Sequence, residues 1–283
     1  MKSSHLLAGL SMAACLICPA LAHGETAAEA FARGNTLMTK GEFQEALQAF
    51  SAAARVERNN QQYMQQFMLV RRVVILRDSL GQERDPRRWQ AVAQSLRSFY
   101  IGRRLYREAL SLDEQIHARL NTTSSAAQLA QTQLAMGQPA DAEKVLASLG
   151  PKNGTAATQS LLGIALARQG RVDEARNVAG KVAPPQEAGP ATLYSLARMH
   201  AVVGNHGQAL GMLTRCFEAV APSRLDGFKS HARQSPDFAS LASTDGFAKV
   251  LKTQSKVAES KCSGGSSCAG CPMRGKCPSS QGK

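Results

Sequence analysis

The stretch LLGIALARQGRVDEA, residues 161–175, decides the fold. Its first half spaces apolar and small side chains as one face of a helix, and Gly170 then ends that helix, because glycine tolerates the left-handed conformation at a helix C-terminus. Ala175 follows five residues later, where a larger side chain would push a second helix away from the first. The spacing of a small residue, a Gly and an Ala recurs in four sets: Gly34/Gly41/Ala46, Ala130/Gly137/Ala142, Gly163/Gly170/Ala175 and Ala197/Gly204/Ala209.

The recurrence has a fixed period, since Gly137, Gly170 and Gly204 are 33 and 34 residues apart. A period of this size predicts stacked antiparallel helical hairpins, an all-α solenoid. We expect about five hairpins, with a degenerate one at 87–120 where Arg104 replaces the turn glycine. Residues 60–81 predict one long inserted helix. A stack of this kind favours a surface that holds another macromolecule over a catalytic pocket.

These residues resemble the tetratricopeptide repeat family over most of residues 26–220. The segment from Ser235 through Phe238 to Leu251 resembles the closing segment of such arrays. The resemblance implies that the first helix of each hairpin faces a concave groove that binds extended peptides. By register, the groove side chains are Asn35, Gln131, Arg168, Tyr194 and Arg198. The full carboxylate-gripping cluster of chaperone-binding members is absent, but two Arg and a Tyr can hold an acidic or C-terminal segment by charge-assisted hydrogen bonds.

The first 22 residues predict a secretory signal peptide. Lys2 supplies a positive start, an apolar stretch follows, and Ala20-Leu21-Ala22 is a small-x-small cleavage site before His23. A lipoprotein anchored at Cys15 is the alternative, because residues 12–15 loosely resemble a lipobox, and an uncleaved anchor is a further one. Cleavage predicts a periplasmic or secreted protein with no transmembrane segment.

Charge is concentrated in two zones. The formal net charge is +13, and residues 55–119 hold 13 Arg, no Lys and seven acidic residues. Residues 247–283 add seven basic residues and one acid. These zones favour anionic partners, which for an exported protein excludes nucleic acid. The other interpretation is that the arginines pair within helical faces and keep the protein soluble.

The last residues have a different composition, with Cys262, Cys268, Cys271 and Cys277 in a Ser/Gly-rich tail. Three interpretations are open: two disulfides, a thiolate site for Zn or Cu, or an iron–sulfur cluster. Elsewhere, Cys216 is expected to be a buried core residue. His200 and His206, on either side of the Gly204 turn, are expected to face solvent.

The domain plan is a signal peptide at 1–22, a repeat domain at 23–258 and a cysteine-rich tail at 259–283. No nucleophile–base pair or carboxylate pair points to catalysis. The sequence therefore predicts a non-enzymatic adaptor or scaffold of the cell envelope that binds a protein or peptide partner. The alternative is a metal-handling or thiol-redox protein that acts through the four-cysteine tail.

Overall fold

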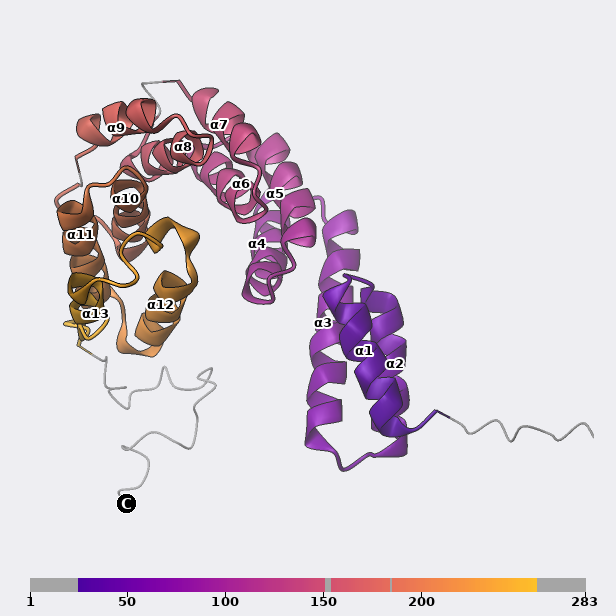
Figure 1. Cartoon of the computed structure of the whole chain (residues 1–283). Helices are drawn as coiled ribbons and strands as arrows, with labels where there is room; N and C mark the ends of the chain where they lie inside the picture. The colour runs from indigo at the N-terminus through magenta and orange to yellow at the C-terminus, as the bar shows by residue number, and fades with distance from the viewer. Residues whose placement is uncertain (1–24, 151–153, 184, 259–283) are drawn as a thin grey trace, which may run out of the picture. The chain divides into compact units, whose positions relative to one another are not determined.

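The computed structural model describes residues 25–150, 154–183 and 185–258, and these residues form helices connected by short turns (Figure 1). The predicted signal peptide and the four tail cysteines lie outside the described residues. The helices in chain order are α1 Ala27–Thr39, α2 Phe43–Val56, α3 Gln61–Gln82, α4 Pro86–Gly102, α5 Tyr106–Leu120, α6 Thr123–Ala135, α7 Pro139–Ala147, α8 Ala156–Arg168, α9 Val172–Lys181, α10 Pro190–Val202, α11 His206–Ala219, α12 Pro222–Gln234, the 3-10 helix η1 Pro236–Phe238, and α13 Asp245–Val250.

The predicted hairpin turns are confirmed. The turn glycines all have positive φ: Gly41 80°, Gly137 74°, Gly170 81° and Gly204 86°. The alanines five residues later, Ala46, Ala142, Ala175 and Ala209, are fully buried. The degenerate hairpin is also present as α4 and α5, and Arg104 takes the left-handed conformation there with φ 58°.

Threonine begins several first helices. The side chains of Thr26, Thr122 and Thr155 each accept a hydrogen bond from the backbone N–H three residues on, at the starts of α1, α6 and α8. The side chain of that third residue in turn binds the N-cap backbone, which completes a capping box. These local signals fix where the helices begin.

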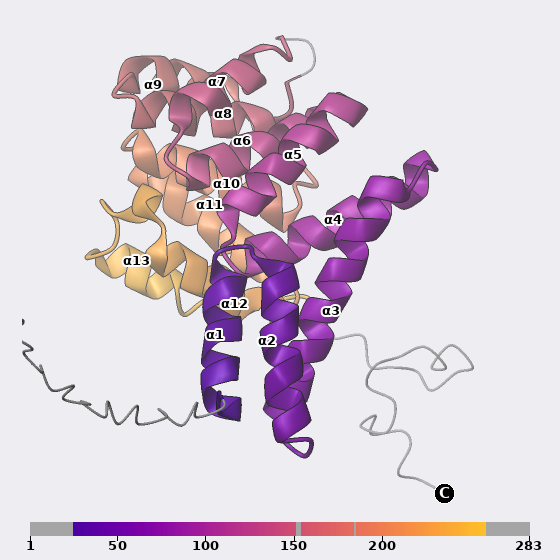
Figure 2. The same cartoon turned by 90° about the vertical axis from the view of Figure 1, so that its right-hand side faces the viewer.

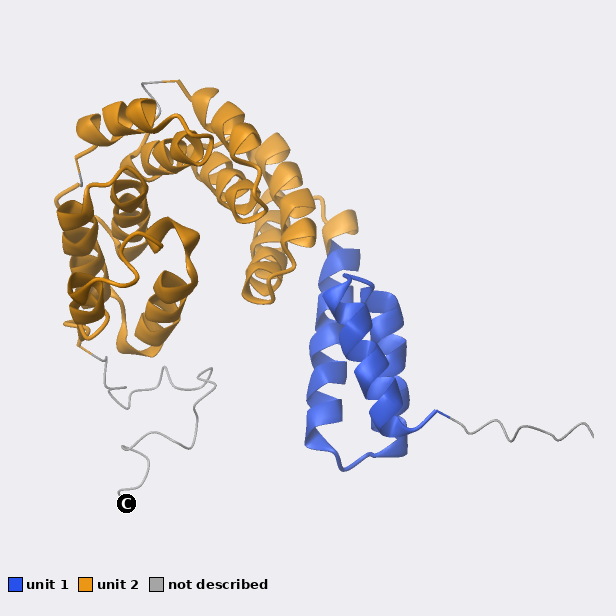
Figure 3. Ribbon diagram, viewed as in Figure 1, with its two compact units in different colours: residues 1–79 blue, residues 80–283 orange. Residues whose placement is uncertain are grey.

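The chain divides into two compact units, residues 1–79 and residues 80–283 (Figure 3), and the boundary between them lies inside the predicted repeat domain at 23–258. In unit 1, α1 and α2 form a hairpin, and α3 runs beside them (Figure 2). Phe31 of α1 stacks on Tyr63 of α3 with ring centroids 4.6 Å apart. Gly34 is required at its position, because a Cβ there would lie 2.8 Å from the Phe50 ring.

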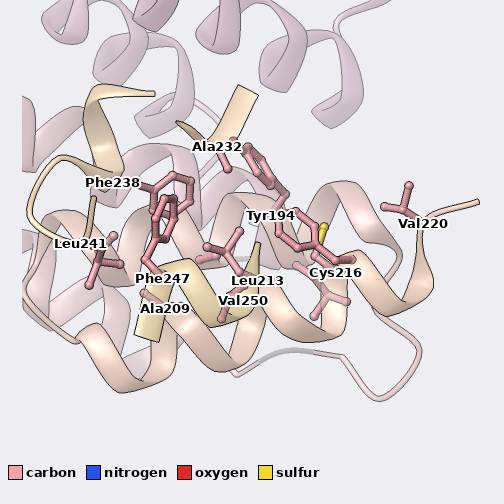
Figure 4. Close-up of a cluster of buried hydrophobic side chains, with 14 of the residues drawn as sticks. Tyr194, Ala209, Leu213, Cys216, Val220, Ala232, Phe238, Leu241, Phe247 and Val250 are labelled. Carbon is pink, nitrogen blue, oxygen red and sulfur yellow. The ribbon is translucent and has the colours of Figure 1, made fainter. Parts of the chain in front are cut away.

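Unit 2 is a curved stack of hairpins that starts at α4 (Figure 1). The first helices α4, α6, α8 and α10 line the inner side of the curve, and α5, α7, α9 and α11 lie on the outer side. The last hairpin is covered by α12, η1 and α13. Phe238 of η1 and Phe247 of α13 join Leu213 and Cys216 of α11 in one buried cluster (Figure 4). The predicted closing segment is therefore present, and α12 precedes it.

Candidate functional site

The inner side of unit 2 is the candidate site, and part of it is covered by the chain itself. Helix α12 and η1 lie inside the curve that the first helices make (Figure 1). The segment α12–η1 is held by two contacts with residues far away in the sequence. Arg104, in the turn between α4 and α5, donates to Gln234 at the end of α12, and η1 packs on α10.

Asp237 of η1 is held by two arginines from the first helices. Its Oδ1 accepts from Arg168 Nε at 2.9 Å and Nη2 at 2.7 Å, and its Oδ2 accepts from Arg198 Nε at 2.6 Å. The Asp237 side chain is only 2% exposed, so these charge-assisted bonds form away from water. Arg168 Nη1 also donates to the Leu134 carbonyl at 2.7 Å, which connects α8 to α6. We call this arrangement of Arg168, Arg198 and Asp237 the Asp237 clasp.

Next to the clasp, Tyr194 of α10 contacts His231 of α12. Tyr194 is buried, and burial raises the pKa of its hydroxyl, which therefore stays protonated at neutral pH. Tyr194 Oη lies 2.6 Å from Nδ1 of His231 in α12. Burial, and secondarily Arg198, lower the pKa of His231, although part of this residue reaches solvent. A neutral His231 can accept the hydrogen bond from Tyr194, which fixes α12 against α10.

The five predicted groove residues are thus placed in three different settings. Arg168, Tyr194 and Arg198 are brought together, and their partners belong to the chain's own closing segment. Gln131 is exposed on α6. Asn35 is half-buried on α1, in unit 1.

Asp237 and His231 are the site residues that sequence reasoning missed. Asp237 stands in the closing segment that the sequence singled out, but its carboxylate was not matched to Arg168 and Arg198. The available signal was charge, because an acid between Pro236 and Phe238 in a basic chain needs a cationic partner once it is buried.

A second buried carboxylate lies earlier in the stack and is held by one arginine and one threonine. Asp113 of α5 is fully buried, and accepts from Arg97 Nε of α4 and Thr132 Oγ1 of α6, both at 2.6 Å. Arg97 also donates to the Gln128 carbonyl at 3.3 Å. At each of these two buried carboxylates, one arginine of a first helix bonds the carboxylate. The same arginine also donates to a backbone carbonyl of the neighbouring first helix α6. Arginine therefore connects successive hairpins along the stack.

The cysteine and the two histidines that the sequence analysis singled out outside the tail are not part of the Asp237 clasp. Cys216 is fully buried, as expected, and burial raises its pKa to about 12, so the thiol is a poor nucleophile. The expectation that His200 faces solvent is wrong: it is 4% exposed, because α10 is packed between α8 and α11. His206 is exposed. Within the described ranges no three His, Cys, Asp or Glu side chains gather as metal ligands. None of the described helices has the length and hydropathy needed to cross a bilayer.

Comparison with known proteins identifies two of the hairpins. The tetratricopeptide repeat model matches residues 156–181 and residues 190–215, which are the hairpins α8–α9 and α10–α11. These two hairpins are tetratricopeptide repeats. Both matched repeats carry an arginine of the Asp237 clasp on their first helix, so the clasp joins two tetratricopeptide repeats.

The chain was also compared with solved structures and with curated proteins. A thermophilic tetratricopeptide-repeat protein from Thermus thermophilus has a solved structure that is similar at 19% identity and a TM-score of 0.38, covering 72% of this chain and 97% of that chain. No curated protein matches the chain. The identification of tetratricopeptide repeats rests on the two matched hairpins.

Proposed function

We propose that this protein is a non-enzymatic tetratricopeptide-repeat scaffold of the cell envelope, which binds a protein or peptide partner on the inner side of unit 2. The Asp237 clasp is the observation that carries the proposal. It shows that the first helices can hold an acidic residue followed by an aromatic one, Asp237-Phe238, through arginine and aromatic contacts. Arg168 and Arg198 are taken up by Asp237, so the clasp is a precedent for a segment held on this side of the stack and is not itself the partner site.

The segment α12–η1 covers α8 and α10, so we assign partner binding to the part of the inner side that α4 and α6 supply. Gln131 is exposed there. Gln94 of α4 and Gln128 of α6 bond each other side chain to side chain at 3.1 Å, and each amide has further donor and acceptor capacity. Amide side chains of this kind bond the backbone of an extended peptide without selecting its sequence. Specificity would then come from neighbouring charged side chains.

Site-specific photocrosslinking in the natural host tests the binding side. Benzoylphenylalanine replaces Gln131 on the inner helix α6, or Gln208 on the outer helix α11, which is the matched control because both glutamines are exposed. We expect discrete crosslinked species from position 131 and none in common with position 208. Identical patterns at the two positions, or crosslinks only at position 208, would contradict the proposal.

The envelope location rests on the predicted signal peptide and has its own test. The mature protein should appear in the fraction released by osmotic shock, with an N-terminus that begins at His23. A protein that retains Met1 and stays with the cytoplasm would remove the location and leave the scaffold function standing. A membrane-bound form that begins at a lipidated Cys15 would support the lipoprotein alternative.

A further inference from the structure

Exposed apolar side chains are concentrated on one helix. Five large hydrophobic residues of the described chain are strongly exposed, and four of them lie between residues 56 and 75. Three are on α3: Met64 is 41% exposed, Met68 52% and Ile75 51%. Single exposed apolar residues are ordinary, but a group on one helix needs an explanation.

Helix geometry puts these three side chains on one face. At about 100° per residue, positions 64, 68 and 75 project within about 40° of each other. The buried face of α3 is a different one, formed by Tyr63, Val70, Val73 and Val74. The apolar stripe of α3 therefore does not belong to the core of unit 1.

The stripe borders a shallow depression of about 660 Å³. Met64, Met68 and Leu69 contribute its apolar lining, and Arg58 and Arg72 contribute cationic groups. The depression runs from the turn after α2 along the first half of α3. Methionine suits such a surface, because its unbranched, polarizable side chain adapts to different partners.

Arginines flank the stripe. On the helical projection Arg71 and Arg72 lie on opposite sides of it, and both are exposed. Within the part of the chain that the structure describes, no ion pair forms at Arg58, Arg71 or Arg72. The stripe thus has one exposed arginine on each side, and Asp78 is exposed one heptad after Arg71. An apolar stripe flanked by arginines is complementary to a helix whose apolar stripe is flanked by acidic residues.

We propose that this face of α3 is a docking surface for an acidic amphipathic helix of a partner protein. The partner's apolar side chains enter the depression against Met64 and Met68, and its Glu or Asp side chains pair with Arg58, Arg71 and Arg72. A second copy of the chain fits less well, because a two-fold interface would bring the same arginines together. A flat lipid surface also fits less well than a helix, because the apolar lining is hollowed and has no exposed Trp or Phe at its rim. This surface belongs to unit 1, and the proposal does not depend on the inner side of unit 2.

Hydroxyl-radical footprinting of the full chain tests the exposure and the docking together. Met64 and Met68 should oxidise quickly, whereas Met38 and Met199, which are buried, report the background. Adding a stapled amphipathic helical peptide with Glu on its polar face should protect Met64 and Met68. The same peptide with Lys in place of Glu should not. Slow oxidation of both methionines in the unliganded chain would show that another part of the chain covers the face, and would overturn the proposal.

Fluorescence anisotropy with the same labelled peptides gives the affinity. Arg72→Glu should weaken binding of the Glu peptide by about tenfold or more, and Met68→Gln should also weaken it, because they remove charge and apolar contact respectively. Arg107→Glu is the matched control, since Arg107 is exposed on α5 and has no ion pair among the described residues. Circular dichroism should show all three variants folded, because the changed side chains are exposed.

Three results would overturn the docking proposal. The first is that neither peptide binds the native chain. The second is binding to vesicles of equal parts phosphatidylglycerol and phosphatidylcholine that Arg72→Glu abolishes, with no peptide binding. The third is a dimer in light scattering that Met68→Gln dissociates, again with no peptide binding. Each result identifies a different occupant, and none affects the crosslinking test on α6.

Discussion

Arg168 and Arg198 on the inner side of unit 2 and Arg71 and Arg72 of α3 have opposite surroundings. Arg168 and Arg198 are largely buried, with side chains 22% and 13% exposed, and they share one carboxylate. Arg71 and Arg72 are exposed and have no ion pair among the described residues. The same residue type therefore pairs with a buried acid in one region and is exposed without an ion pair in the other, among the described residues.

This difference separates two interpretations of the basic composition that the sequence left open. Pairing within the fold accounts for Arg97, Arg168 and Arg198, and each of these bonds a buried acid. Arg58, Arg71 and Arg72 form no ion pair among the described residues, and they are the arginines that we propose bind a partner. A count of arginines cannot distinguish the two groups, but substitutions can.

Asp237→Asn should have the largest effect on stability. It removes the shared carboxylate and leaves Arg168 and Arg198 without a counter-charge, which we expect to lower the free energy of unfolding by about 3 kcal/mol. Urea unfolding followed by circular dichroism measures the change. Asp141→Asn is the control, because Asp141 pairs with Lys144 at 3.3 Å on the surface, and its loss should cost about 0.5 kcal/mol or less. Equal effects of the two substitutions would show that the clasp does not stabilise the fold.

Arg198→Ala and Arg72→Ala compare the two regions directly. Arg198→Ala should lower the free energy of unfolding by about 2 kcal/mol, because Asp237 keeps Arg168 as a partner but loses half of its compensation. Arg72→Ala should change it by no more than about 0.5 kcal/mol. In the peptide-binding assay the order should reverse. If Arg72→Ala proved the more destabilising variant, α3 would have a structural partner on that face.

Arg104 is an intermediate case, because its guanidinium bonds Gln234 while its backbone takes the left-handed conformation. Arg104→Gly and Arg104→Ala both remove the side-chain bond, so their difference isolates the backbone. The Gly variant should be more stable than the Ala variant by about 1 kcal/mol. Thermal unfolding of the two proteins in parallel measures the difference. Ala more stable than Gly would mean that the turn has another conformation.

Acidification should lower the free energy of unfolding by the smallest amount, and the effect should arise in unit 2. Burial lowers the pKa of His200 from its ordinary value of 6.5. The unfolded chain then binds the proton more readily than the folded one, so stability is complete above pH 6.5 and falls as the pH drops below it. Urea midpoints on either side of that pH should show the decline, and His200→Gln should reduce it. His206→Gln, at an exposed position, should leave the decline unchanged.

The hairpins could be predicted because their signals are local. A glycine that ends one helix and an alanine five residues later both act within a single hairpin, so Gly170 and Ala175 identify their unit without any distant partner. The long helix was predicted at 60–81 and is observed at Gln61–Gln82. Its two faces could not be assigned, since Met68 and Ile75 are as apolar in the sequence as Val70 and Val74.

The clasp could not be predicted because it has no periodicity. Asp237 is 69 residues from Arg168 and 39 from Arg198, and no spacing rule relates an acid in a closing segment to arginines of first helices. Register placed Arg168, Tyr194 and Arg198 in the predicted groove, and in the structure all three contact the closing segment. What it could not show is that the chain itself supplies their partners.

The contacts that close unit 2 also bear on how it unfolds. In a stack of repeats each hairpin contacts only its neighbours, and such stacks lose their end repeats one at a time. Here Asp237 joins α8 and α10 to η1, and Arg104 joins a turn at one end of the stack to Gln234, 130 residues later. Fraying of the last hairpin would break contacts with earlier ones. We therefore expect the hairpins from α4 to α11 to unfold as one cooperative block, with similar amide exchange rates at both ends.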